Sequence, residues 1–397
     1  MNQDGPDPTR HAPLLDTAWD ADEARLAVQE IIGDAEAHLR PHGLWPAHPQ
    51  DDNLPDDAAC LYMGGAGVVW ALDHLRRHGF RVGLDLPALL PRVWDAHRAE
   101  VRWFGQYAAL PSLLMGDVGL LLLEMRLTGS DGAAERLGSR VAEACYLPVR
   151  ELMWGLPGAM LACLDAHALT GEARWRELFR SAAARLLGDL PDSEWGPIWV
   201  QDLYGKRQCW LGPVHGYAGN LAPLLRGWAW LDATQQAAVA ASLRSVLPAT
   251  ARRLPQGTTW PAVAGRDGPA RLVQHCHGAP GMVTTLAAGP VRLPEVEPLL
   301  REAGELTWRA GPLAKGSNLC HGTAGNGYAF LRLWRHTGEA VWLHRARAFA
   351  MTAIMQCREA RKALGRGRFT LWTGDPGLAI YLWACLEGEV GFPTVDL

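Results

Sequence analysis

The sequence lacks a long uninterrupted apolar run, and its first twenty residues are polar and rich in proline. The apolar stretch Gly119–Leu123 ends at once at Glu124. A transmembrane helix needs about 20 predominantly apolar residues, and a secretory signal needs a basic start followed by an apolar core. We therefore expect no integral membrane segment and a cytoplasmic location.

An excess of charge of either sign is also missing, since 42 acidic and 38 basic residues leave a net charge of −4. Such a chain has no global electrostatic reason to bind nucleic acid or an anionic membrane. Its eight cysteines, scattered over 397 residues, do not form a disulfide framework. In a reducing compartment most of them should be buried thiols. We expect no nucleic-acid partner.

Glycine, in contrast, is abundant, with 43 residues in the chain. Seven Gly-x-x-Gly motifs account for fourteen of them, and an apolar, helix-like run follows each motif. The motifs begin at Gly64, Gly116, Gly155, Gly216, Gly278, Gly322 and Gly374. A period of roughly 50 residues is typical of a repeat architecture. We expect these glycines to allow sharp turns with positive φ and to let the loops crowd together at one end of the fold.

A second repeated pattern lies between the motifs, where Thr170-Gly-Glu-Ala-Arg-Trp175 matches Thr337-Gly-Glu-Ala-Val-Trp342. Glycine at a C-cap ends one helix, and the acidic residue favours the start of the next. The segments after these turns read as half-buried helices, whereas those after Gly-x-x-Gly are apolar on nearly all sides. We predict an all-α fold, a closed double-ring (α/α) toroid or barrel with seven inner and seven outer helices, because an open solenoid would expose a large apolar face.

The predicted organisation has two parts. Residues 1–50 form an N-terminal segment with one amphipathic helix, Asp20–Arg40, which precedes the ring. Residues 51–397 form a single seven-repeat α/α toroid domain. Before the last repeat, the basic stretch Arg358–Arg368 is expected either as a solvated loop or as a collector of the carboxylates of glutathione or of an acidic peptide leader.

Three consecutive repeat loops carry the residue types that bind metals. Cys276-His277 and Cys320-His321 each stand directly before a Gly-x-x-Gly, and His215 precedes another. If the ring brings these loops together, two thiols and several imidazoles meet, which is the ligand chemistry that Zn²⁺ prefers. The alternative is a pair of buried thiols, with histidines that cap helix N-termini. A closed set of four ligands would be structural, whereas three ligands and an open position would be catalytic.

These residues resemble the lanthionine synthetase C-like family, which comprises the zinc-containing cyclases of lanthipeptide biosynthesis and their glutathione-binding eukaryotic relatives. The resemblance covers essentially the whole chain and is most specific at 276–281 and 319–331. It implies a seven-fold double ring of helices, in agreement with the repeat count. It also implies one Zn²⁺ per chain, with Cys276, Cys320 and His321 as ligands.

The resemblance also implies roles for residues around that metal. His215 and His277 correspond to groups that handle protons, and Glu151 matches an acidic position of the third repeat. Arg271, five residues before the first cysteine, is a candidate for contacting a carbonyl or a carboxylate, and its position is similar to that in the glutathione-binding branch. His275 stands where the family usually has tryptophan, and its ring could be an extra ligand or a hydrogen-bond partner.

The expected chemistry is the addition of a thiol to an activated double bond. A zinc-activated thiolate would attack the β-carbon of dehydroalanine or dehydrobutyrine, and the resulting enolate needs a donor and a proton. Three functions stay open at this point. They are thioether formation within a dehydrated peptide, conjugation of glutathione or another thiol to a dehydroamino acid, and a non-catalytic zinc- or glutathione-binding scaffold. The sequence carries no kinase-type phosphate-loop signature, so a dehydratase would be a separate partner.

Overall fold

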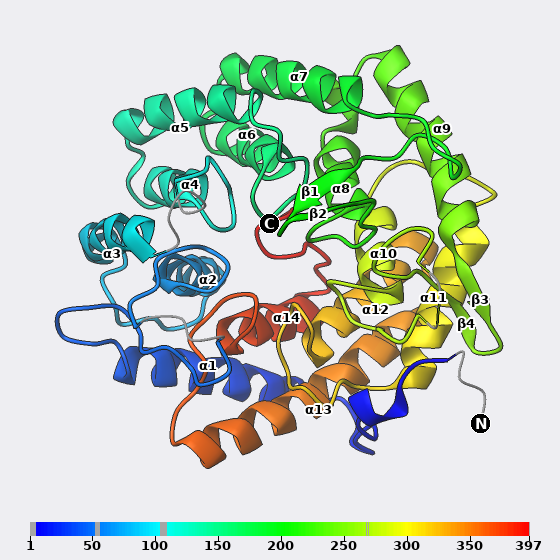
Figure 1. The fold of residues 1–397 in the computed structure, drawn as a ribbon. Coiled ribbons are helices and arrows are strands. Elements are labelled where there is room, and N and C mark those ends of the chain that lie inside the picture. The colour runs from blue at the N-terminus through cyan, green and yellow to red at the C-terminus, as the bar shows by residue number, and fades with distance from the viewer. Residues whose placement is uncertain (1–4, 52–55, 104–108, 267, 269, 397) are drawn as a thin grey trace.

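The structure, a computed structural model, describes residues 5–51, 56–103, 109–266, 268 and 270–396. Within these residues, fourteen α-helices form two concentric rings (Figure 1). The inner helices are α2 (Gly65–Arg77), α4 (Asp117–Thr128), α6 (Leu156–Thr170), α8 (Tyr217–Arg226), α10 (Ala279–Leu286), α12 (Thr323–Thr337) and α14 (Asp375–Glu387). The outer helices are α1 (Ala21–Ala37), α3 (Leu90–Trp103), α5 (Asp131–Ala144), α7 (Ala173–Gly188), α9 (Ala233–Thr250), α11 (Glu297–Ala310) and α13 (Ala340–Leu364). The predicted double-ring toroid is confirmed.

The remaining described elements are short. Two antiparallel hairpins, β1 (Gln201–Leu203) with β2 (Lys206–Gln208) and β3 (Arg252–Leu254) with β4 (Gly257–Thr259), lie in loops between helices. Three single-turn 3₁₀ helices cover Pro8–Arg10, Pro87–Leu89 and Trp228–Trp230. Among the described residues, none of the helices is both long and apolar enough to cross a membrane.

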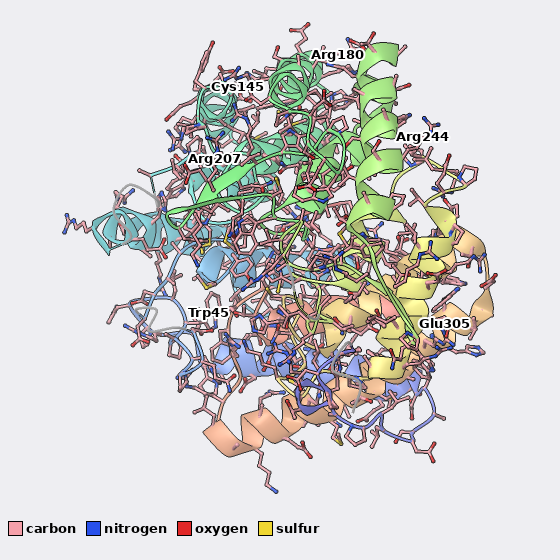
Figure 2. The ribbon with its side chains drawn as sticks, turned by 45° about the vertical axis from the view of Figure 1, so that its right-hand side comes forward. Trp45, Cys145, Arg180, Arg207, Arg244 and Glu305 are labelled. Atoms are coloured by element: carbon pink, nitrogen blue, oxygen red, sulfur yellow. The ribbon has the colours of Figure 1, made fainter. Side chains whose placement is uncertain are left out.

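The two rings differ in burial as their sequences predict. Inner helices such as α8 and α14 are buried over most of their length. The outer helices keep one polar face in water, where Arg180 of α7 and Arg244 of α9 are exposed (Figure 2). Apolar surface is thus removed from water between the rings and inside the inner ring, which is the main favourable contribution to folding.

The turns from inner to outer helices form as predicted. Gly171 and Gly338 end α6 and α12 in the left-handed region, with φ of 72° and 74°. The hydroxyl of Thr170 accepts a hydrogen bond from the indole N–H of Trp175 at 3.0 Å, which ties the turn to the first turn of α7. The Thr-Gly-Glu pattern is therefore a helix C-cap followed by a new helix.

The Gly-x-x-Gly motifs serve close backbone approach, and the expectation of positive φ is wrong for most of them. Of the seven first glycines, only Gly278 has a positive φ, of 113°, and the other six are extended. A Cβ atom on any of the second glycines would lie 1.8–2.8 Å from the carbonyl oxygen six residues earlier. The loop folds back over the first turn of the inner helix, and only a residue without a side chain fits there.

Replacing Gly325 with alanine should therefore destabilise the protein strongly. The new Cβ would lie 1.8 Å from the carbonyl oxygen of Leu319, so backbone has to move. We expect the free energy of unfolding to fall by at least about 3 kcal/mol in a urea titration. The matched control is Gly33→Ala in α1, where nothing lies within 4 Å of the new atom and a gain of about 0.5–1 kcal/mol is expected. Equal effects of the two substitutions would contradict this explanation of the motif.

The N-terminal helix does not precede the ring but belongs to it. Helix α1 packs along α14 and takes the outer position that no helix after α14 fills among the described residues (Figure 1). The division of the chain at residue 50 stays a prediction, but α1 completes the set of seven helix pairs. Packing between the first and last helices closes the ring and leaves no open solenoid end.

The basic stretch 358–368 joins α13 to the N-terminal region. Its first seven residues belong to α13, which extends to Leu364. Arg358 forms ion pairs with Glu23 and Glu30 of α1, and Arg368 forms one with the buried Asp51. Arg358 and Arg368 thus connect the last part of the ring to residues 23–51, whereas residues 362–365 between them are exposed to solvent.

Candidate metal centre

The loops that precede the inner helices meet at one end of the ring and are joined by backbone hydrogen bonds. The amide of Cys276 donates to the carbonyl of Cys320 at 3.0 Å, and the amide of Cys320 donates to the carbonyl of Trp372 at 2.8 Å. Trp372 in turn donates to the carbonyl of Tyr62 at 3.1 Å. Loops that are distant in sequence therefore form one continuous layer, and the side chains within it have fixed neighbours.

The three predicted metal ligands lie together in this layer. The ligand atoms of Cys276, Cys320 and His321 are all within 4.8 Å of one another. Both cysteines are buried, and His321 is half-buried. Zn²⁺ binds thiolate sulfur at about 2.3 Å and imidazole nitrogen at about 2.0 Å, so atoms at this spacing can reach a common ion. The Cys₂His donor set is one that Zn²⁺ prefers, and it leaves a coordination position for another ligand.

Two further side chains donate hydrogen bonds to the sulfur atoms. The hydroxyl of Tyr62 donates to Sγ of Cys320 at 2.8 Å, and the amide of Gln274 donates to Sγ of Cys276 at 3.0 Å. The hydrogen bond between the two thiols lowers the pKa of Cys276 well below the usual thiol range, and the same contact raises the pKa of Cys320 well above it. The contact thus favours the thiolate form of Cys276, and the thiolate is the form that binds a metal.

Removing the Tyr62 hydroxyl should weaken metal binding without removing it. Hydrogen bonds to ligands orient them, and their loss typically lowers metal affinity about 10–100-fold. We expect Tyr62→Phe to raise the zinc dissociation constant by about tenfold in a chelator competition. Tyr217→Phe is the matched control, because this buried tyrosine contacts Ser242 at 2.8 Å, away from the cysteines. A Tyr62→Phe protein with unchanged zinc affinity would show that this hydrogen bond does not support the metal.

A carboxylate and a histidine form a pair in the same layer. Oε2 of Glu151 lies 2.8 Å from Nδ1 of His215. Glu151 is fully buried and also accepts hydrogen bonds from the backbone amides of Met153, at 3.1 Å, and Trp154. An ionised carboxylate only accepts, so the proton of this contact belongs to Nδ1 of His215. The pair therefore fixes the ring of His215 and leaves Nε2 for other chemistry.

His277 is a half-buried neighbour of this pair. Its ring centroid is 5.8 Å from that of Trp210, and its buried Nδ1 has no hydrogen-bond partner among the described residues. Burial lowers the pKa of His277, and this effect outweighs the charge of Cys276, which acts in the opposite direction. This second imidazole is therefore biased toward the neutral form, in which it can accept a proton.

Two other predicted positions lie outside the cluster. Arg271 is exposed, and its positive charge acts on Asp7 on the surface. His275 is not among the clustered ligand atoms, because its ring stacks on Phe392 with centroids 4.2 Å apart and planes 6° apart. Burial lowers the pKa of His275 to about 4. Its ring therefore lies on the interior side of the loop layer, in contact with the C-terminal segment.

The repeat itself provides a signal for residues that motif analysis missed. Cys276 and Cys320 stand two residues before the first glycine of their motifs, and Tyr62 and Trp372 occupy the same position in the first and last repeats. Tyr62 stacks on Trp372 with centroids 5.3 Å apart. Tyr62, Cys320 and Trp372 thus lie beside one another at the same position of their repeats, so the shared position relative to the glycines is the signal that places Tyr62 near the cysteines.

Comparison with known proteins agrees with this geometry. The model of the family described as lanthionine synthetase C-like protein matches residues 151–396. The chain is 34% identical over 220 residues to LanC-like protein GCL1 of Arabidopsis thaliana, covering 53% of this chain and 47% of that protein. It is also 34% identical over 203 residues to glutathione S-transferase LANCL1 of Danio rerio, covering 50% of this chain and 47% of that protein. The chain spans about half the length of the curated relatives it matches.

A solved structure shows the same fold. Nisin cyclase superposes with a TM-score of 0.59 over 92% of this chain and 99% of its own, at 14% sequence identity. At this identity the likeness extends to the fold alone. The family match, which covers more than half of the sequence and includes the two Cys-His motifs, shows that the chain belongs to the lanthionine synthetase C-like family.

Proposed function

We propose that this protein adds a thiol to a dehydroalanine or dehydrobutyrine residue and so forms a thioether, as a lanthionine-cyclase-like enzyme that depends on zinc. The observation that carries the proposal is the joint placement of the Cys276, Cys320 and His321 cluster and the Glu151–His215 pair in one loop layer. Cys276, Cys320 and His321 would hold the metal, one ion per chain. When bound, Zn²⁺ would lower the pKa of a substrate thiol at its remaining position.

The residues of the chain would then manage the protons of the addition. The thiol loses its proton, and its sulfur forms a bond to the β-carbon as the double-bond electrons move toward the carbonyl oxygen. A proton delivered to the α-carbon completes the addition, so no atom is lost. His215 is the candidate donor, because Glu151 holds its Nδ1 and leaves Nε2 toward substrate. His277, biased toward the neutral form, is the candidate acceptor of the thiol proton.

The preferred substrate is a dehydrated peptide with its own cysteine, and glutathione is the second candidate. A pocket of about 330 Å³ adjoins the metal loop and is lined by Lys315, Asn318 and Arg366. Asn318 also accepts a hydrogen bond from the amide of His321 at 3.0 Å, so the pocket begins at the metal loop. Cations beside a thiol site would suit the carboxylates of glutathione. The name of the zebrafish relative, a glutathione S-transferase, also favours glutathione as a substrate.

The proposed chemistry has requirements outside the chain. A dehydratase must supply the dehydroamino acid, which makes a separate dehydratase the expected partner. The thiols must also stay reduced, and all eight cysteines of the chain are free. We therefore propose that the protein works in a reducing compartment, the cytoplasm.

Mass spectrometry of a dehydrated peptide incubated with zinc-loaded protein tests the function. A peptide that contains both a cysteine and dehydroalanine should lose its free thiol without a change in mass. A peptide without cysteine, supplied with glutathione, should gain the mass of one glutathione if conjugation is the activity. If both products form no faster than in the absence of protein, both catalytic proposals are overturned and a non-catalytic scaffold is favoured.

A further inference from the structure

A second cavity, of about 600 Å³, lies on the interior side of the loop layer. Its walls come from the C-terminal ends of α8 and α10 and from the last described residues of the chain, which run into the centre of the ring (Figure 1). Leu152, Pro213 and His275 also line it, and each stands three residues before the first glycine of its motif. The three clustered metal-ligand residues do not belong to its lining. This interior pocket is therefore separate from the thiol site.

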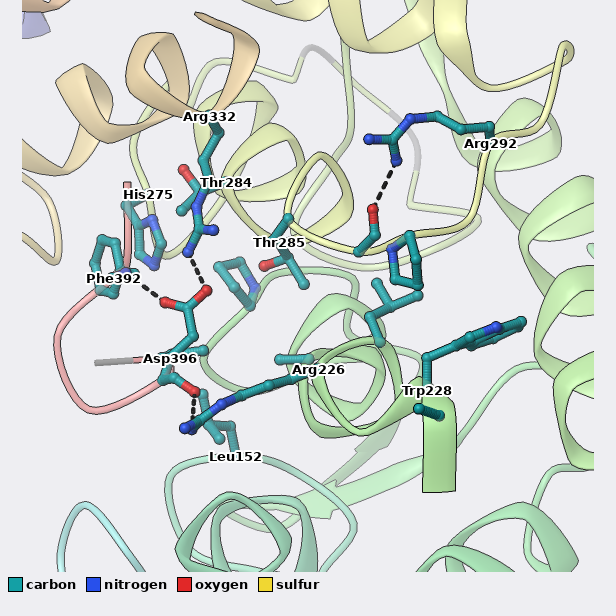
Figure 3. Close-up of a pocket in the computed structure, with 18 of the residues that line it drawn as sticks. Leu152, Arg226, Trp228, His275, Thr284, Thr285, Arg292, Arg332, Phe392 and Asp396 are labelled. Carbon is teal, nitrogen blue, oxygen red and sulfur yellow. Dashed lines mark hydrogen bonds and ion pairs between the residues drawn. The ribbon is translucent and has the colours of Figure 1, made fainter. Parts of the chain in front are cut away.

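The charged residues of the interior pocket are mostly cationic. Its described lining contains three arginines, Arg226, Arg292 and Arg332, and one acidic residue, Asp396. Figure 3 shows Arg332 and Asp396 on one side and Arg292 on the other. Arg332 forms an ion pair with Asp396, and Arg226 forms one with Asp165, which lies outside the lining. Two of the three positive charges thus have a carboxylate partner.

Arg292 has no such partner in the described part of the chain. Its guanidinium donates to the carbonyl oxygens of Gly289, at 2.6 Å, and Val291, at 3.3 Å. Carbonyl groups satisfy hydrogen bonds but do not neutralise a charge. One positive charge at the rim of the pocket is thus left to attract an anion.

Two buried polar atoms in the pocket also lack hydrogen-bond partners in the described structure. They are Nδ1 of His275 and Nε of Arg332, whose side chains belong to residues that are 2% and 5% exposed. Unpaired buried polar groups are uncommon, because each one costs about 1–3 kcal/mol. Both side chains belong to the pocket wall, although these two atoms themselves are covered by protein. Most of the other lining residues, such as Leu225, Trp228 and Pro290, are apolar, and Thr284 and Thr285 are the polar exceptions.

We propose that the interior pocket binds a small organic monocarboxylate with an apolar body. One wall of the pocket already shows how such a ligand could bind. The carboxylate of Asp396 forms an ion pair with Arg332, and the ring of Phe392 stacks on His275. Because only the guanidinium of Arg292 lacks a carboxylate partner among the arginines of the described lining, the pocket favours a ligand with one negative charge over a phosphate dianion. The volume lies within the usual range of small-molecule sites, about 300–1,000 Å³. This site goes beyond thioether formation and does not depend on it.

Calorimetric titration of the full-length protein with 4-phenylbutyrate tests the proposal, with 4-phenylbutanamide as its neutral counterpart. We expect the carboxylate to bind with a dissociation constant below about 1 mM and the amide at least tenfold more weakly, because a charged hydrogen bond is lost. Arg292→Gln should weaken binding of the carboxylate by about 10–100-fold. Asp396→Asn should strengthen it, since Arg332 then loses its internal partner.

Two controls assign the binding to this pocket. Arg309→Gln should leave the affinity unchanged, because Arg309 is also an exposed arginine that donates to a carbonyl, that of Gln256 at 3.1 Å, but does not line the pocket. Ala288→Trp, at an exposed lining position, should block the mouth and abolish binding. Absence of binding, equal affinity for the amide, or equal affinity in the Arg292→Gln or Ala288→Trp proteins would overturn the proposal. Turnover of dehydrated peptides is not used as a readout, so failure here leaves the proposed function untouched.

Discussion

Cys320→Ala is expected to lose most of the zinc and to reduce thioether formation by at least about 10³-fold. This cysteine is one of only three clustered ligand residues in the described structure, and it also receives the hydrogen bond from Tyr62. Two remaining ligands do not hold Zn²⁺ in a site of this kind, which needs three protein ligands. Without the metal, the substrate thiol keeps its ordinary pKa and is a few per cent thiolate at neutral pH.

Elemental analysis after dialysis should give about one zinc per chain for the native protein and far less for Cys320→Ala. The matched control is Cys163→Ala, because Cys163 is fully buried in α6 and lies outside the cluster. This control should keep its zinc and its activity, with only a modest loss of stability. A Cys320→Ala protein with a full complement of zinc would refute the metal assignment.

The sequence predicts the ring because its two kinds of helix have different polarity and its glycine motifs are periodic. It does not predict the reason for the glycines. That reason is a carbonyl oxygen six residues earlier, which depends on how the loop folds over the helix, as between Leu319 and Gly325. The sequence also does not predict that α1 closes the ring. This closure depends on the packing of α1 against α14 and on the ion pairs of Arg358, which join residues more than 300 positions apart.

In the candidate site, too, features that follow from the repeat could be predicted from the sequence, and contacts specific to one repeat could not. Ligand residue types at matching loop positions predict that two thiols and several imidazoles meet, because equivalent positions of a closed repeat converge, and the family resemblance selects Cys276, Cys320 and His321 among them. Contacts that depend on a single repeat could not be predicted. His275, one residue before Cys276, faces the interior because it occupies the position that is leucine or proline in the other repeats. Arg271, seven residues before the first glycine of its motif, is exposed and belongs to no cluster of ligand atoms in the described structure.

His215→Asn is expected to lower thioether formation by about 10²–10⁴-fold while zinc remains bound, because a positioned general acid contributes a factor of that size. Glu151→Gln should have a smaller effect in the same direction, of about tenfold or more, since glutamine can donate to Nδ1 and so favour the wrong tautomer of His215. Rates of thiol loss on a cysteine-containing dehydrated peptide, measured beside zinc content, separate this effect from metal loss.

The stereochemistry of the product provides a readout that a purely structural role would not change. If His215 delivers the proton to one face of the enolate, the native enzyme makes a single configuration at the α-carbon, and His215→Asn gives a mixture by solvent protonation. The matched control is His336→Asn, because His336 also pairs with a carboxylate, Glu297, but between α12 and α11 away from the loop layer. A His215→Asn protein that still makes one configuration at the native rate would assign proton delivery to another group, because asparagine cannot act as a general acid at that position.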